Sequence, residues 1–75
     1  MERIHQNTMF AFLRGNKPVD VRFWKKNGDA VQIHALPLKE HRERGTWSFK
    51  CLPSDVVRTV RTVSIFGIDD YEVFL

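Results

Sequence analysis

Hydrophobic and polar residues alternate through the middle of the chain. In residues 19–26, Val19, Val21 and Phe23 share one face, and most of the other face is polar or charged. Residues 30–38 and 46–52 alternate in the same way. A period of two is typical of a strand that buries one face. These three segments therefore predict strands.

The dipeptide Asn-Gly at positions 27–28 stands between the first two segments and predicts a hairpin. A two-residue turn would set Phe23 opposite Gln32 and mix apolar with polar faces. A three-residue loop over 26–28 sets Phe23 opposite Val31, and the hydrophobic pattern favours this register. The remaining pairs are Val21 with Ile33, Val19 with Ala35, Trp24 with Ala30, Arg22 with Gln32, and Asp20 with His34. The loop requires the third residue, a glycine, in the left-handed region.

The flanking segments are less regular. Residues 8–14 are short, apolar and aromatic, and a Gly-Asn-Lys-Pro break follows them, which predicts a strand and a turn. Residues 1–7 lack periodicity, so we expect a flexible leader over 1–7 and a single small β-domain over 8–75. The charged residues 39–45 predict a loop, and residues 53–55 predict a turn.

Residues 56–68 are rich in β-branched side chains and longer than a usual strand. The alternation slips near Arg61-Thr62, which predicts two strands separated by a bend, a bulge or one 3₁₀ turn. A helix over 55–66, capped by Ser54 or Asp55, is the rival interpretation, and the β-branched residues disfavour it. Asp69-Asp70 then predicts a turn into a last strand over 71–75.

Together these segments predict an all-β fold of five to seven short strands. We expect a small antiparallel barrel or a strongly bent sheet, SH3-like or Sm-like in size. A chain of 75 residues makes one domain. One cysteine excludes an internal disulfide, and no apolar run reaches the ~18 residues of a membrane helix. Because the N-terminus also lacks the pattern of a signal peptide, we expect a cytoplasmic protein with no membrane partner.

Candidate catalytic and metal-binding residues are few. The three histidines and the one cysteine lack the paired spacing of a zinc site. His34 is expected to form a surface pair with Asp20. Cys51 shares a predicted core face with Trp47 and Phe49, where a thiol is usually inert. We therefore predict no enzyme, no catalytic residue, no metal and no cofactor.

The remaining feature is positive charge. Net charge is +3, and all twelve lysines and arginines lie before the acidic C-terminal segment. Basic side chains around an outward tryptophan suit nucleic acid, single-stranded more than duplex, because cations follow the phosphates and the ring stacks a base. The candidate nucleic-acid-binding residues are Arg22, Trp24, Lys25, Lys26, Lys39, Arg42, Arg44, Lys50, Arg58 and Arg61.

Other interpretations of this surface stay open. Basic residues on outer strand faces also keep edge strands from aggregating. Trp24 can equally lie over another element, and Glu40 and Glu43 neutralise part of the charged loop. The alternative function is a protein-interaction or inhibitor module that pairs through exposed aromatic residues and a strand edge, with a partner protein or with itself.

Residues 18–75 resemble a family of short, uncharacterised bacterial proteins, some of them from mobile elements. The resemblance rests on Val-Arg-Phe-Trp-Lys-Lys-Asn-Gly-Asp at 21–29, Val-Arg at 60–61 followed by Val-Ser-Ile-Phe at 63–66, and Glu-Val-Phe-Leu at 72–75. It implies a bacterial protein of this size, and it assigns no activity and no site residue. Such sequences often carry an Asn-Gly-like turn before the last strand, where this chain has Asp69-Asp70.

Overall fold

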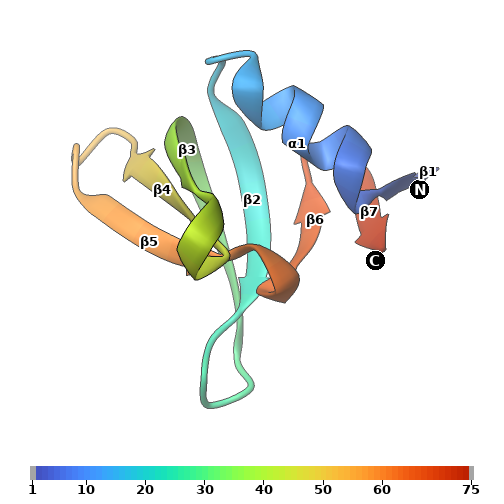
Figure 1. Ribbon diagram of the computed structural model, residues 1–75. Coiled ribbons are helices and arrows are strands. Elements are labelled where there is room, and N and C mark those ends of the chain that lie inside the picture. Colours follow the sequence, from blue (N-terminus) through green and yellow to red (C-terminus); the bar gives the residue numbers. More distant parts are fainter. Residues whose placement is uncertain (1, 75) are drawn as a thin grey trace.

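The alternating segments form strands of one sheet in the computed structural model, which describes residues 2–74 (Figure 1). The elements are, in chain order, β1 (Glu2–His5), α1 (Gln6–Arg14), β2 (Val19–Trp24), β3 (Ala30–His41), the 3₁₀ turn η1 (Arg42–Arg44), β4 (Thr46–Cys51), β5 (Val57–Arg61), the 3₁₀ turn η2 (Thr62–Ser64), β6 (Ile65–Ile68) and β7 (Tyr71–Phe74). None of the helices within residues 2–74 is long and apolar enough to cross a membrane.

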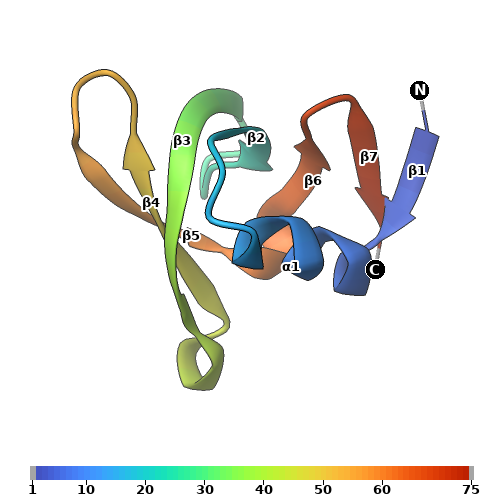
Figure 2. The same ribbon diagram turned by 90° about the horizontal axis from the view of Figure 1, so that it is seen from above.

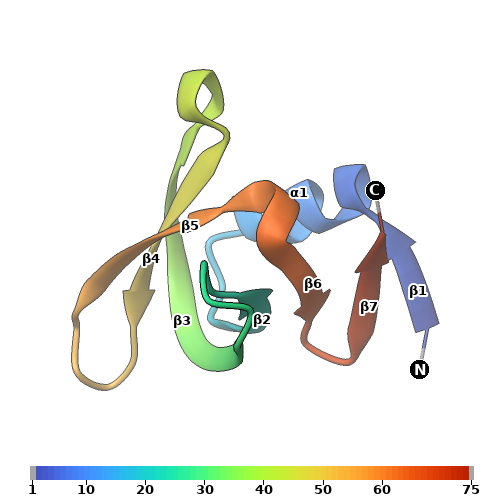
Figure 3. The same ribbon diagram turned by 90° about the horizontal axis from the view of Figure 1, so that it is seen from below.

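The seven strands follow the order β1-β7-β6-β2-β3-β4-β5. The sheet is mixed rather than fully antiparallel, because β1 runs parallel to β7. It bends strongly, with β3, β4 and β5 on one side of the bend and β6, β7 and β1 on the other (Figures 2 and 3). Over the described residues the sheet does not close into a barrel, so β1 and β5 remain edge strands.

The hairpin between β2 and β3 has the predicted register. Val21 pairs with Ile33 and Phe23 with Val31, so the apolar side chains meet on one face. The N–H of Gly28 donates to the carbonyl of Lys25 at 3.0 Å, and Gly28 has a φ of 90°. The three-residue loop over 26–28 is therefore confirmed, with glycine in the left-handed region as the turn requires.

The long β-branched segment is divided as predicted. β5 ends at Arg61, η2 makes a single 3₁₀ turn, and β6 follows. The bend is anchored by Thr62, whose backbone N–H and hydroxyl both donate to the carbonyl of Gly45, at 3.0 and 3.1 Å. The rival helix over 55–66 is wrong. The turn at 69–70 and the last strand are confirmed as far as Phe74, and residue 75 lies outside the described residues.

The predicted strand over 8–14 is wrong, because these residues belong to α1. Met9 and Leu13 stand four residues apart and are both buried, which places them on one face of a helix. His5 caps the helix, since its Nδ1 accepts the N–H of Asn7 at 3.0 Å. Residues 2–5 also differ from the expected flexible leader, because they pair with β7 over their whole length. Residue 1 lies outside the described part.

The charged segment 39–45 is only partly a loop. β3 continues to His41, so Lys39 and the two residues after it pair with β4. Leu38 is the extra residue at a bulge, because Pro37 pairs with Phe49 and Lys39 pairs with Ser48. Such a bulge lets β3 and β4 resume their pairing after Pro37, because proline has no N–H to donate to the neighbouring strand.

The core lies inside the bend of the sheet, and α1 packs against it (Figure 2). Trp47 and Phe49 of β4 are buried, as the sequence predicts, whereas Cys51 at the end of the same strand is only half-buried. The buried hydrophobic residues of this core are Met9, Leu13, Val19, Val21, Phe23, Ala35, Trp47, Phe49, Val60, Ile65 and Ile68.

Candidate nucleic-acid interface

A groove of about 550 Å³ opens where the β2–β3 hairpin comes close to β5 and η2. Five of the ten candidate residues border it. We call it the basic groove, and its lining residues are Phe23, Trp24, Lys25, Lys26, Asn27, Arg58, Thr59, Val60, Arg61 and Ser64. Residues from two distant parts of the sequence therefore meet at one site.

The core forms part of the groove wall. Phe23 and Val60 are buried, and Arg58 lies on the same face of the sheet as Phe49, its partner across β4 and β5. The guanidinium of Arg58 sits 5.6 Å from the centroid of the Phe23 ring, a cation–π contact. Arg58 is thus held at the border between core and groove, with an aromatic ring orienting its charge.

Four cations surround the basic groove: Lys25, Lys26, Arg58 and Arg61. No carboxylate lines it, and none of the four forms an ion pair with another residue in the range 2–74. Asp29, the nearest acid along the hairpin, bonds instead to Asn27, accepting from its side-chain amide at 3.0 Å. The positive charge of the groove is therefore not neutralised locally, and it favours an anionic ligand.

Trp24 stands at the rim of the groove. It lies on the outer face of β2, opposite Ala30, and its side chain is 49% exposed. One part of the indole stacks on Phe66, with ring centroids 4.5 Å apart. Both sequence-based interpretations thus hold in part, because Trp24 points outward and also lies against another element.

The other candidate residues lie elsewhere. Arg22 is half-buried on the outer face of β2, where its Nη2 donates to the carbonyl of Tyr71 at 2.9 Å. Lys50 of β4 pairs with Asp55, with Nζ and Oδ1 3.6 Å apart. Lys39, Arg42 and Arg44 are exposed near the tip of the β3–β4 hairpin. These five do not line the basic groove.

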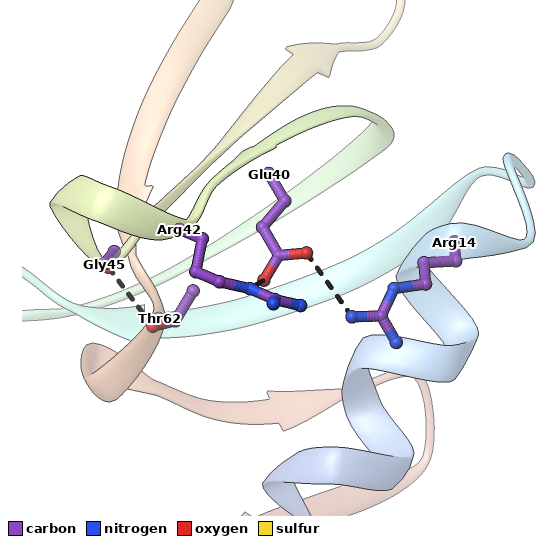
Figure 4. A network of polar contacts seen from close by, with 5 residues as sticks. All are labelled: Arg14, Glu40, Arg42, Gly45 and Thr62. Carbon is purple, nitrogen blue, oxygen red and sulfur yellow. Dashed lines mark hydrogen bonds and ion pairs between the residues drawn. The ribbon is translucent and has the colours of Figure 1, made fainter.

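A second cavity of about 430 Å³ lies among α1, β3, η1 and η2. Among its lining residues, Glu40 has its carboxylate between the guanidiniums of Arg14 and Arg42 (Figure 4). We call this site the polar cavity. Sequence reasoning missed Arg14 and Glu40, because Arg14 was placed on a strand and the two residues meet only through the packing of α1.

Two of the histidines form side-chain contacts elsewhere in the sheet. His34 and Asp20 form the predicted exposed pair, with Nδ1 and Oδ1 2.8 Å apart. His41 Nε2 lies 2.9 Å from the hydroxyl of Ser48. In residues 2–74 no three His, Cys, Asp or Glu side chains come together as metal ligands would.

The sequence matches no family model and no curated protein, and the fold matches no solved structure. A fold does not by itself assign a function, so only the chemistry of the two sites bears on what this protein does.

Proposed function

We propose that the protein binds single-stranded nucleic acid in the basic groove. One observation carries the proposal: four cations without ion-pair partners within residues 2–74 surround a groove that has a half-exposed tryptophan at its rim. The cations would follow the phosphates of the strand, and binding would release the counterions condensed on it. The indole of Trp24 would stack a base.

The preference for a single strand follows from Trp24. A base can stack on an aromatic side chain only after it has left its own stack, which costs nothing in an already unpaired strand. Stacking on an aromatic ring tolerates every base, so this contact supplies affinity with little sequence preference. A duplex would keep the phosphate contacts and lose the stacking.

We propose that the basic groove binds nucleic acid and does not catalyse a reaction on it. The lining residues of the groove supply cations, amides and hydroxyls, and no histidine, cysteine or carboxylate is among them. Histidine and the carboxylates are the side chains that most often act as general acids and bases, and cysteine is the most nucleophilic side chain at neutral pH. The composition of the groove therefore supports a binding role.

A titration of labelled single-stranded and duplex oligonucleotides at about 50 mM salt tests the proposal. We expect Arg61→Glu to weaken single-strand binding by roughly tenfold or more, because it removes one phosphate contact and adds a repulsive charge. Lys17→Glu is the matched control, since Lys17 is exposed at the opposite end of β2. No binding at this salt concentration, or equal effects of the two variants, would contradict the proposal.

A second candidate function has its own support. β5 is an edge strand, and its first residue, Val57, and the preceding Val56 are both more than half exposed. An exposed apolar edge invites pairing with another strand, as in a protein-interaction or inhibitor module. Symmetric pairing of two β5 strands about Thr59 and Val60 would set Arg58 against the Arg61 of its partner, which favours an acidic partner over a second copy. Light scattering at high concentration tests self-pairing, and a strict monomer would remove that version.

A further inference from the structure

The polar cavity is separate from the basic groove and shares no lining residue with it. It is bounded by α1, the end of β3, η1 and η2 (Figure 4). Its polar lining residues are Asn7, Arg14, Glu40, Arg42, Thr46 and Thr62. Its volume of about 430 Å³ falls within the range of small-molecule sites.

Glu40 has hydrogen-bonding capacity to spare. Its Oε1 lies 3.4 Å from Nη2 of Arg14, and its Oε2 lies 3.8 Å from Nε of Arg42. Charge-assisted hydrogen bonds between these groups are usually about 2.7–2.9 Å long. A carboxylate also has about four lone-pair sites. Both oxygens of Glu40 can therefore accept further hydrogen bonds from a ligand, although the side chain is only 23% exposed.

The hydroxyl groups of the two lining threonines are not available to a ligand. Oγ1 of Thr46 is buried, and Thr46 lies on the opposite face of β4 from Trp47, the residue that pairs with Glu40. The hydroxyl of Thr62 donates to the carbonyl of Gly45 at 3.1 Å. A ligand in this cavity would therefore be bound by Glu40 and the two arginines.

We propose that the polar cavity binds a guanine base of the nucleic-acid strand, an inference that rests on the function proposed above. The Watson–Crick edge of guanine presents two adjacent donors, N1–H and N2–H₂, and a carboxylate accepts both together. The O6 of guanine lies beside N1–H. O6 and N7 together form the acceptor pair that arginine prefers. Because a guanidinium flanks each oxygen of Glu40, O6 would face an arginine in either orientation of the base.

The other bases fit this arrangement less well. On the Watson–Crick edge of adenine and of cytosine, an amino donor lies beside a ring nitrogen that is an acceptor. That ring nitrogen would face the carboxylate of Glu40 without a hydrogen bond. Uracil and thymine have a single N–H between two carbonyl oxygens. Glu40 would repel one or both of those oxygens. Only guanine offers two donors side by side, so the site would read one base.

The two sites are close along the chain. Arg61 lines the basic groove, and the next residue, Thr62, lines the polar cavity. A strand whose phosphates lie in the groove would cross η2 to place a base beside Glu40. The exposed Arg42 adds one more cation at the mouth of the cavity for the phosphate of that nucleotide.

Base substitution in one oligonucleotide tests the inference. A uridine hexamer, its variant with a single central guanosine, and the same variant with inosine or adenosine would be titrated against the protein. Inosine lacks only the N2 amino group. We expect guanosine to bind roughly tenfold or more tightly than inosine, and adenosine to bind no better than uridine.

Glu40→Gln supplies the second arm of the experiment, because an amide cannot accept both guanine donors as a carboxylate does. We expect this variant to bind the guanosine and inosine hexamers equally. Glu72→Gln is the matched control, since it makes the same change of charge in an exposed pair with Arg3 on another part of the sheet. It should keep the full preference.

The possible outcomes separate the two proposals. Hexamers that all bind equally, with binding still weakened by Arg61→Glu, would overturn the guanine site and leave the basic groove standing. A guanosine preference that survives Glu40→Gln would overturn it as well. If no hexamer binds at low salt, the result contradicts the nucleic-acid binding proposed for the basic groove, on which the guanine site rests. Comparison of guanosine with inosine in the unmodified protein decides the question even where the Glu40 variant folds poorly.

Discussion

The indole of Trp24 and the ring of Phe66 stack with their centroids 4.5 Å apart and their planes 29° from parallel. Phe66 reaches this position because it is an extra residue in β6, where the pairing with β2 shifts between Arg22 opposite Gly67 and Phe23 opposite Ile65. The bulge therefore gives Trp24 an aromatic support on its outer face. A supported ring loses less conformational freedom on binding a base.

Tryptophan fluorescence should report binding at the groove. Trp24 is half exposed and Trp47 is 3% exposed, so a base stacked on an indole would quench the emission of Trp24 alone. We expect the quenching by single-stranded DNA to disappear in Trp24→Phe and to persist in Trp47→Phe. Loss of a stacked base in Trp24→Ala should cost about 1–3 kcal/mol of binding free energy. Quenching that remains in Trp24→Phe would contradict the proposed contact.

The salt dependence of binding should count the phosphate contacts. Each neutralised phosphate of a single strand contributes about 0.7 to the slope of log K against log salt concentration. Lys26→Gln should therefore lower the slope by roughly that amount, because Lys26 borders the groove and has no ion-pair partner among residues 2–74. Lys17→Gln should leave the slope unchanged. Equal slopes for the native protein, Lys26→Gln and Lys17→Gln would show that Lys26 does not contact a phosphate.

Stability should depend on the glycine of the hairpin. Gly28 has a φ of 90°, which costs an L-residue with a Cβ about 1–2 kcal/mol. Gly28→Ala should lower the free energy of unfolding by about that amount in urea titrations. Gly28→Asn should cost less, because asparagine tolerates positive φ better than alanine does. The opposite order would show that the strain lies outside the backbone of this turn.

Arg22 and Gly67 should be energetically coupled. A Cβ on Gly67 would collide with the guanidinium of Arg22, which donates to the carbonyl of Tyr71 from that position. Gly67→Ala should therefore destabilise the protein in the native background. The same substitution should cost at least about 0.5 kcal/mol less in an Arg22→Ala background, because the obstacle is gone. A double-mutant cycle measured by urea unfolding checks this, and additive effects would refute the coupling.

Packing of α1 should contribute strongly to stability. Leu13 is buried in the core, whereas Leu38 is exposed at the bulge of β3. Leu13→Ala should lower the free energy of unfolding by about 2–5 kcal/mol. Leu38→Ala makes the same change of side chain and should cost no more than about 0.5 kcal/mol. Similar losses in the two variants would show that α1 is not docked as described.

Much of the sheet could be predicted because its signals are local. Alternation over 19–26 and 30–38, with one glycine in the turn, was enough to choose the register of the hairpin. The break in the β-branched segment was visible in the spacing of its valines. The bulge at Leu38 was not visible, because it depends on which residues of β4 stand opposite Pro37.

The sequence itself shows why residues 8–14 were wrongly predicted to form a strand. The segment is short, apolar and aromatic, which suggested a strand, yet Thr8 is its only β-branched residue and Met9 and Leu13 have helical spacing. The period of the buried residues was the better signal. Correcting it would also have placed Arg14 on a helix, although not beside Glu40.

The sequence by itself determined the strands that follow residue 18, the hairpin register and the outward direction of Trp24, because side-chain alternation and turn geometry act over a few residues. Tertiary structure alone decided which cations gather. Arg58 and Arg61 join Lys25 and Lys26 because the sheet bends and brings β5 to the hairpin. Arg22 is turned to Tyr71 by the glycine opposite it. Such meetings depend on contacts between residues far apart in the chain, and no local pattern encodes them.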